Sequence, residues 1–148
     1  MNNPLQRATH AILRIGTGLL FIEHGFQKFG FLGGLGGPCC AWNATGPTAA
    51  AIGLTRLQVA GWMELVGGAL LIAGFLTRPV AAVLLLEMVV AFFLAHFPRG
   101  GSPMQNGGEI PLLYACVFAF LAAHAAGPVS VDETITPHRQ ESRVTPHR

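Results

Sequence analysis

The chain has 148 residues, of which 51% are hydrophobic and only 11% are charged, and its formal net charge is +2. A soluble domain usually carries about 25% charged residues, so this chain lacks the charge to cover a water-exposed surface. Its apolar content also excludes intrinsic disorder, and the small net charge without a basic stripe gives no reason to expect nucleic-acid binding. We therefore expect a membrane protein.

The apolar residues gather in four runs, which predict transmembrane helices at about 8–32, 57–76, 79–97 and 110–127. Each run can cross a hydrocarbon core of about 30 Å at about 1.5 Å per residue. Helices satisfy their own backbone hydrogen bonds in lipid. The predicted fold class is therefore all-α, a polytopic membrane four-helix bundle that forms a single domain over residues 1–127.

Basic residues suggest how the bundle is oriented. With four spans both termini lie on one side, and that side carries more basic residues (Arg7, Arg78, Arg139, Arg143 and Arg148) than the other (Lys28, Arg56 and Arg99). By the positive-inside rule we expect cytoplasmic N- and C-termini. We expect residues 33–55 and 98–108 to form outer loops, and residues 128–148 to form a polar, disordered cytoplasmic tail.

Three carboxylates lie inside the predicted spans, namely Glu23, Glu64 and Glu87. A charged residue at the centre of a membrane helix costs roughly 2.5–3.5 kcal/mol on the insertion scale, so such residues usually face the interior of a bundle and mark a functional site. All three fall roughly 10–15 Å below the outer surface. One polar chamber in the outer half of the bundle would explain them together.

Small residues accompany two of these acids. The helical period places Gly16 and Gln27 on the face of Glu23, and Gly61 and Gly68 on the face of Glu64. Since small residues let membrane helices approach closely, we expect both faces to point at neighbouring helices. His24 and Lys28 form an i,i+4 pair beside the first face and could neutralise a carboxylate.

His96 and Glu109 are weaker candidates for the same chamber. His96 follows Glu87 by nine residues, about 180° around a helix, so the two cannot face one narrow site without a bend. Glu109 precedes the fourth run, where the helix dipole alone can explain an acid. For the whole set the alternative is that acids and bases only pair with each other to fix helix packing.

No established cofactor motif is visible. The sequence has no Cys-x-x-Cys, haem-attachment, phosphate-loop or dinucleotide pattern, and so no haem, metal or nucleotide signature. His24 and His96 could ligate a haem or metal, but their spacing has no specificity. The adjacent Cys39 and Cys40 could oxidise, although a vicinal disulfide is strained.

A series of short motifs recurs in a characteristic order along the chain. It comprises Arg14-x3-Gly18, His24-Gly25-x2-Lys28, Gly61-Trp62-x-Glu64-x2-Gly67-Gly68, Gly74-x2-Thr77-Arg78, Met88-x2-Ala91-x4-His96, Gly107-Gly108-Glu109-x-Pro111-Leu112-Leu113, and Gly127-Pro128 with Ser130 and Asp132. In this order and spacing the chain resembles the DoxX family of small bacterial and archaeal inner-membrane proteins. The chain's end departs from the family pattern, because it lacks the extra glycine and aromatic residue often present there.

The resemblance implies a four-span inner-membrane bundle and a link to membrane redox chemistry, since the family takes its name from a thiosulfate:quinone oxidoreductase system. Our first hypothesis is a redox-linked subunit that binds quinone in the outer half of the bundle. Glu64 and Glu23 would exchange protons with the quinone. The other candidate ligand-binding residues are His24, Lys28, Trp62, Glu87, His96 and Glu109, with Trp62 or Phe26 stacking on the ring.

Such a chain would need a partner to supply electrons, so as an enzyme it would be a subunit of a quinone-linked oxidoreductase. Two alternatives remain open: a small proton-coupled transporter that uses the carboxylates as a relay, and a non-catalytic assembly subunit of a larger membrane complex. In each case we expect self-association or a membrane-protein partner.

Overall fold

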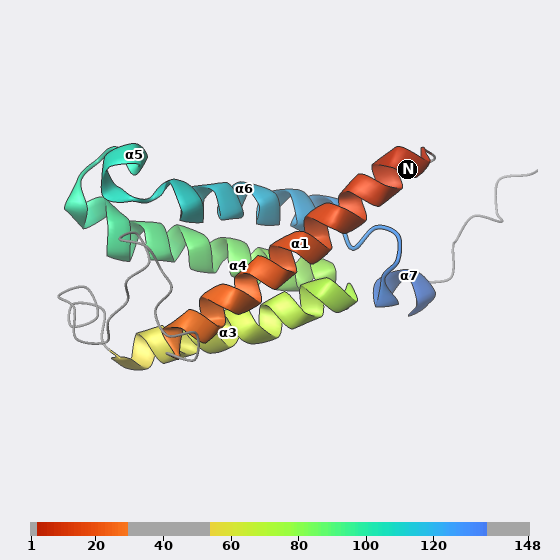
Figure 1. Cartoon of the computed structure of the whole chain (residues 1–148), viewed down its shortest axis with the longest axis horizontal. Coiled ribbons are helices and arrows are strands. Elements are labelled where there is room, and N and C mark those ends of the chain that lie inside the picture. Colours follow the sequence, from red (N-terminus) through yellow and green to blue (C-terminus); the bar gives the residue numbers. More distant parts are fainter. Residues whose placement is uncertain (1–2, 30–53, 136–148) are drawn as a thin grey trace, which may run out of the picture.

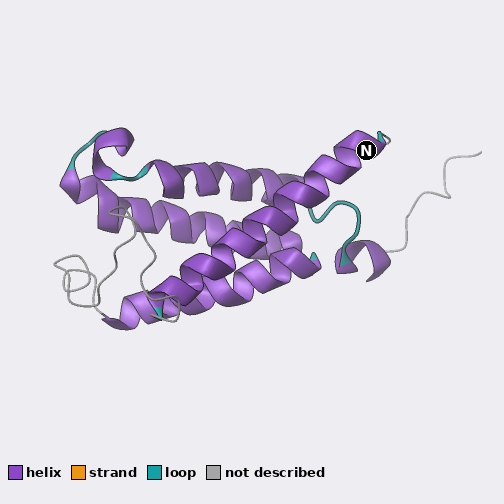
Figure 2. Cartoon of the chain, viewed as in Figure 1, coloured by secondary structure: helices purple, strands orange, loops and turns teal. Residues whose placement is uncertain are grey.

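The computed structural model describes residues 3–29 and 54–135 of the chain. Every regular element in these ranges is helical (Figure 2), which confirms the predicted all-α class. The elements in chain order are α1 (Pro4–Lys28), α3 (Leu54–Ala73), α4 (Thr77–Ala91), η1 (Phe92–His96), η2 (Phe97–Arg99), α5 (Pro103–Asn106), α6 (Glu109–His124) and α7 (Val131–Ile135).

The four long helices run along the length of the molecule (Figure 1). The most extensive packing joins α1 to α3 and α4 to α6, while α3 and α4 share a smaller contact. The helix ends therefore gather at two places. At the "pocket end", α1 finishes, α3 begins, and η1, α5 and the start of α6 meet. At the "clip end", the N-terminus lies near the α3–α4 turn, the end of α6 and α7.

Glycines bring α1 and α3 together. A Cβ atom on Gly18 would lie 2.8 Å from the carbonyl oxygen of Gly68, and one on Gly68 would lie 2.7 Å from that of Gly18. Nearer the pocket end, a Cβ on Gly25 would lie 2.9 Å from the carbonyl oxygen of Gly61. No side chain fits at such distances, so these positions permit a close backbone approach, as small residues do between membrane helices. Gly61 and Gly68 thus face a neighbouring helix, as predicted.

A single helical stretch within the described residues, Thr77–Arg99, is long and apolar enough to cross a membrane. Gln58–Ala73 and Glu109–His124 are apolar but shorter, and charged residues interrupt α1. The four predicted spans match the four long helices in position, although length and hydropathy support one of them as a full span. The four-span topology therefore stays a prediction.

The beginning of the segment predicted as a disordered tail is structured. Here Asp132 lies in α7, and its carboxylate accepts hydrogen bonds from the backbone N–H groups of Leu76 (2.8 Å) and Thr77 (2.9 Å). These donors open α4 and have no partner inside that helix, so the acid caps it from a distant part of the chain. The prediction of disorder does not hold for residues 128–135; residues 136–148 lie outside the described residues.

A buried arginine completes this end of the fold. The guanidinium of Arg14, which is fully buried, donates hydrogen bonds to the carbonyl oxygens of Leu71 (2.6 Å), Ile72 (2.8 Å) and Val129 (2.7 Å). Two of these carbonyls end α3, where a cation also complements the helix dipole. The third follows α6, so Arg14 ties three segments together. Gly74, with φ +67°, leaves the space, since a Cβ there would lie 2.5 Å from the Arg14 Nη1 atom. We call Arg14, Gly74 and Asp132 the clip.

Candidate functional site

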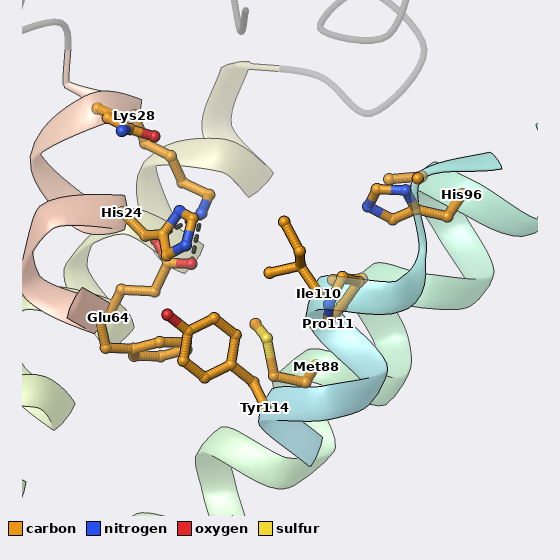
Figure 3. A pocket seen from close by; sticks show the side chains of 13 residues that line it. His24, Lys28, Glu64, Met88, His96, Ile110, Pro111 and Tyr114 are labelled. Carbon is orange, nitrogen blue, oxygen red and sulfur yellow. Dashed lines mark hydrogen bonds and ion pairs between the residues drawn. The ribbon is translucent and has the colours of Figure 1, made fainter. Parts of the chain in front are cut away.

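A cavity of about 120 Å³ opens among α1, α3, η1 and α6 at the pocket end. Side chains from all four elements and from α4 line it (Figure 3). They are Phe21, His24, Gln27, Lys28, Glu64, Met88, Ala91, Ala95, His96, Ile110, Pro111 and Tyr114, together with Gly107. The lining thus combines apolar groups with a few polar ones, which is the usual composition of a small-molecule site.

An ion pair lies at the centre of one wall. Lys28, in the last turn of α1, places its Nζ atom 2.5 Å from both carboxylate oxygens of Glu64 in the middle of α3. The Glu64 side chain is only 3% exposed and that of Lys28 is 18% exposed. Gly61, one turn before Glu64, makes room for the lysine, because a Cβ there would lie 3.3 Å from the Lys28 Cβ. The predicted neutralisation of a carboxylate by Lys28 is thus seen in the structure.

Breaking a buried ion pair of this kind changes the free energy of unfolding strongly, even where forming it does not. Desolvation of two buried charges can cancel their attraction, so the intact pair is no proof of added stability. Removing one partner, however, leaves the other charge uncompensated in an apolar surrounding. We therefore expect both charges of this pocket wall to be kept or lost together.

Aromatic rings form the floor beside the ion pair. The His24 ring stands edge-on to Tyr114 at 5.7 Å between centroids and to Phe21 at 6.4 Å. Phe21 in turn packs edge-on to Phe118 at 4.8 Å. These rings position His24 from both α1 and α6. Tyr114, which is half-buried, was not among the predicted site residues, although it is the chain's single tyrosine and lies in an otherwise apolar run.

His96 joins the pocket through a change in helix type. η1 is a π-helix, in which the N–H of Phe97 donates to the carbonyl of Phe92 five residues earlier. A π turn holds one residue more than an α turn and so shifts the following side chains by about 100°. The separation of Glu87 and His96 around the helix axis is therefore smaller than the roughly 180° expected for a regular α-helix. His96 lines the cavity, whereas Glu87 does not.

Asn106 holds the histidine in place. Nδ1 of His96 lies 3.1 Å from the Asn106 carbonyl oxygen, which can only accept a hydrogen bond. Nδ1 therefore carries the proton, and in the neutral ring Nε2 is an acceptor. The buried Asn106 side chain donates to the carbonyl of Gly100 (2.6 Å) and accepts from the N–H of Gly108 (2.8 Å). The connection between η2 and α6 is thereby tied to the same residue that orients His96.

Three predicted site residues lie elsewhere. Glu23 is exposed on α1, because the buried face of that helix runs through Gly25 and Glu23 is about 200° away from it. Trp62 is 60% exposed and packs its ring edge-on to Phe29 at 5.2 Å, outside the pocket. Glu109 is exposed in the first turn of α6, where the helix dipole explains an acid.

Glu87 occupies an intermediate position. It does not line the cavity, but both carboxylate oxygens are buried and have no hydrogen-bond partner within the described part of the chain. Its surroundings include the charges of Glu64 and Lys28, which act on it electrostatically. The structure therefore gathers Glu64, Lys28, His24 and His96 around the pocket with Glu87 behind them. Cys39 and Cys40 lie outside the described residues.

The cavity limits what can bind. An engineered apolar cavity of about 150 Å³ holds benzene, so the pocket has room for one small ring or a few waters. Within residues 3–29 and 54–135, no three His, Cys, Asp or Glu side chains gather as metal ligands do. His24 and His96 are the imidazoles available to a ligand, and they lie on opposite sides of the cavity (Figure 3).

Comparison with known proteins gives the class and then the family. The fold and the site define a helical protein in which a buried ion pair borders a small pocket. The DoxX family model matches residues 9–97, and the chain belongs to this membrane-associated family, as its motifs indicated. The match includes Lys28, Glu64 and His96, whereas Tyr114 lies beyond it.

Two relatives from Haemophilus influenzae are similar to the chain. One is 38% identical over 125 residues, which cover 82% of this chain and 87% of the relative. The other is 36% identical over 78 residues, which cover 53% of this chain and 52% of the relative. Both are uncharacterized proteins. No solved structure matches the chain.

Proposed function

We propose that this protein is a four-span subunit of the inner membrane that binds a quinone head group in the pocket and serves a membrane oxidoreductase. The observation that carries the proposal is the placement of hydrogen-bonding groups on opposite walls of one small, otherwise apolar cavity. Lys28 and His24 lie on one wall and His96 on the other. This arrangement suits a ring with oxygens at opposite ends, because Lys28 can donate to one oxygen while Nε2 of the neutral His96 ring can accept from the hydroxyl that the other oxygen carries in the reduced quinol form.

Each polar residue has a separate task in this proposal. Lys28 has three N–H donors, and two are directed at the Glu64 oxygens. The third is free to reach a ligand oxygen from the α1 wall, with His24 beside it. His96 is held by Asn106 on the far wall. The aromatic floor of Phe21 and Tyr114 keeps the ring site apolar between them.

A bound quinone supplies two-electron redox chemistry that also takes up two protons, and the electrons come from the partner oxidoreductase. The Glu64–Lys28 pair lies in the cavity wall, within reach of the ligand oxygen, a placement that proton transfer in catalysis requires. From its sequence position Glu23 was expected to have a similar role. Its exposed position makes Glu87, with its buried carboxylate near Glu64, the better second acid. Buried acids of this kind mark proton routes in membrane proteins.

The size of the cavity restricts the proposal to the head group. Sites for whole ligands occupy about 300–1,000 Å³, and the pocket has about 120 Å³. An isoprenoid tail would therefore lie outside it, among lipid chains. Both termini are then cytoplasmic and the pocket opens in the outer half of the bilayer, as the distribution of basic residues suggests.

Mass spectrometry of an organic extract from gently purified protein tests this function. We expect near-stoichiometric quinone in the wild type and its loss in Glu64→Gln. Glu23→Gln is the matched control, because it makes the same change on an exposed carboxylate of α1, and it should retain quinone fully. Bulk lipids alone in the wild-type extract, or equal retention by both variants, would contradict the proposal.

A proton-coupled transporter is the second candidate, favoured by the Glu87 carboxylate, which has no hydrogen-bond partner among the residues that the structure describes and feels the charges of Glu64 and Lys28 through electrostatic interaction. Two neighbouring acids form the beginning of a relay across the bundle. If this function is right, proteoliposomes will show solute movement that depends on a pH gradient and that stops in Glu87→Gln. If the protein neither binds quinone nor moves a solute, the remaining function is that of an assembly subunit. Loss of a larger membrane complex in a deletion strain would test that function.

A further inference from the structure

A second and larger hollow lies at the clip end, far from the pocket. Its volume is about 800 Å³, within the range of ligand sites. The walls come from four places in the chain, namely the first turns of α1, the α3–α4 turn, the end of α6 and the start of α7. The lining residues are Arg7, Leu76, Thr77, Arg78, Pro79, His124, Ala125, Ala126, Gly127, Pro128, Ser130, Asp132 and Glu133. We call this hollow the basal groove.

The two acids of the basal groove are already engaged. Glu133 pairs with Arg7 at 3.3 Å and also accepts the N–H of Val129 at 3.0 Å. Asp132 caps the start of α4 and interacts electrostatically with the buried Arg14. Within the described residues neither carboxylate forms an ion pair with Arg78. The helix N-terminus of α4 is likewise satisfied by Asp132 and attracts no further anion on its own.

Arg78 is left as the uncompensated cation. It is exposed, and the one contact that the structure gives it within the described residues is a donation to the carbonyl of Ala123 at 3.1 Å. A guanidinium has five N–H donors, so most of its hydrogen-bonding capacity is unused. His124, whose Nδ1 faces the Phe120 carbonyl at 2.9 Å, lines the same groove. The groove thus offers a fork of donors to an anion, and this fork belongs to Arg78, since Nε2 of a neutral His124 ring is an acceptor.

Apolar side chains stand beside these donors. Leu76 in the lining is 51% exposed, and Val129, between two lining residues, is 76% exposed. A free phosphate gains nothing from such neighbours, whereas a lipid brings both a phosphate and acyl chains. Basic pockets between membrane helices at the cytoplasmic surface bind anionic head groups in this way.

We infer that the basal groove binds the head group of an anionic phospholipid, with its phosphate on the guanidinium of Arg78 and its acyl chains beside Leu76 and Val129. The inference rests on the membrane placement in the proposed function and does not depend on quinone. Part of the groove lining comes from residues 128–133, so the segment after α6 serves to complete a lipid site as well as to cap α4.

Native mass spectrometry of the full chain, released from nanodiscs of mixed phosphatidylglycerol and phosphatidylcholine, tests the inference. We expect phosphatidylglycerol to be retained in preference to phosphatidylcholine. Arg78→Gln should lower its apparent affinity about fivefold, the effect of one basic residue near an anionic surface, and Arg78→Lys should keep most of it. Arg99→Gln, a matched control at the opposite end of the same continuous helical stretch, should leave it unchanged.

Three results would overturn the inference: equal retention of the two lipids, equal loss in Arg78→Gln and Arg99→Gln, or full displacement of phosphatidylglycerol by inorganic phosphate at the same concentration. The last would assign the groove to a soluble anion. Glu64→Gln separates this inference from the proposed function, since it should remove quinone and leave phosphatidylglycerol bound. Circular dichroism of each variant shows that the helices are intact.

Discussion

The two ends of this molecule use the same helix to bury a cation, and they treat it differently. Arg14 and Lys28 lie on one side of α1, separated by about four turns. At the clip end the arginine is fully buried and donates to three backbone carbonyls. At the pocket end the lysine pairs with the Glu64 side chain and borders a cavity.

The difference lies in what the partners can do. A backbone carbonyl does not change its protonation state. The contacts of Arg14 therefore hold the end of α3 and the segment after α6 together at any pH. A carboxylate can gain a proton, release its partner and face a ligand. A buried charge with backbone partners is therefore best interpreted as a structural element, and a buried pair of side chains beside a cavity as a site. Both charges would look alike in a hydropathy plot.

The largest effect is expected where the backbone depends on the charge. Replacing Arg14 with Gln leaves carbonyls of α3 and of Val129 without a donor in a buried place, which should lower the free energy of unfolding by about 3–5 kcal/mol. Arg14→Lys keeps the charge but lacks the planar set of donors of the guanidinium. Its free energy of unfolding should therefore fall between those of the wild type and Arg14→Gln. Denaturant or thermal unfolding in detergent measures both.

Arg56→Gln is the control for that experiment. Arg56 is exposed at the start of α3, and its replacement should change stability by no more than about 0.5 kcal/mol. If Arg14→Gln were as stable as Arg56→Gln, the contacts with the carbonyls would not hold the clip together, and the distinction between the two ends would fail.

The second effect concerns the pair at the pocket end. Lys28→Met leaves the Glu64 carboxylate buried alone and should cost about 3 kcal/mol or more in unfolding free energy. Adding Glu64→Gln to that variant removes the stranded charge, so the double variant should be more stable than Lys28→Met. The coupling energy from this double-mutant cycle should reach about 1–3 kcal/mol. Additive losses would show that the two side chains do not interact in solution.

Some features of the fold and of the site could be predicted from the sequence, and others could not. The helices could be predicted because each apolar run is long enough for a helix, which satisfies its own backbone hydrogen bonds in lipid. The pairing of Lys28 with a carboxylate could be predicted from its opposite charge. The face of α1 was predicted from Glu23 and Gly16, whereas the contact with α3 passes through Gly18 and Gly25. Both sets obey the helical period, and only the neighbouring helix decides between them.

Other parts of the site depend on contacts between distant segments. The role of Arg14 requires knowing that α3 ends beside it, and a sequence shows only a charge that interrupts an apolar run. The π turn that brings His96 toward the pocket has no composition signal of its own. The short helix α7 is polar and resembles a tail until Asp132 is seen to cap α4.

The smallest expected effect sharpens the comparison most, because it concerns a residue that the sequence favoured and the structure does not. Glu23 is exposed one residue before His24, so Glu23→Gln should change the unfolding free energy by less than about 0.5 kcal/mol and leave the Lys28–Glu64 coupling energy unchanged. The same cycle measured in the Glu23→Gln background gives the readout. A coupling that fell by half or more would place the Glu23 carboxylate in the electrostatic network of the pocket, and the buried acids could no longer be separated from the exposed ones by burial alone.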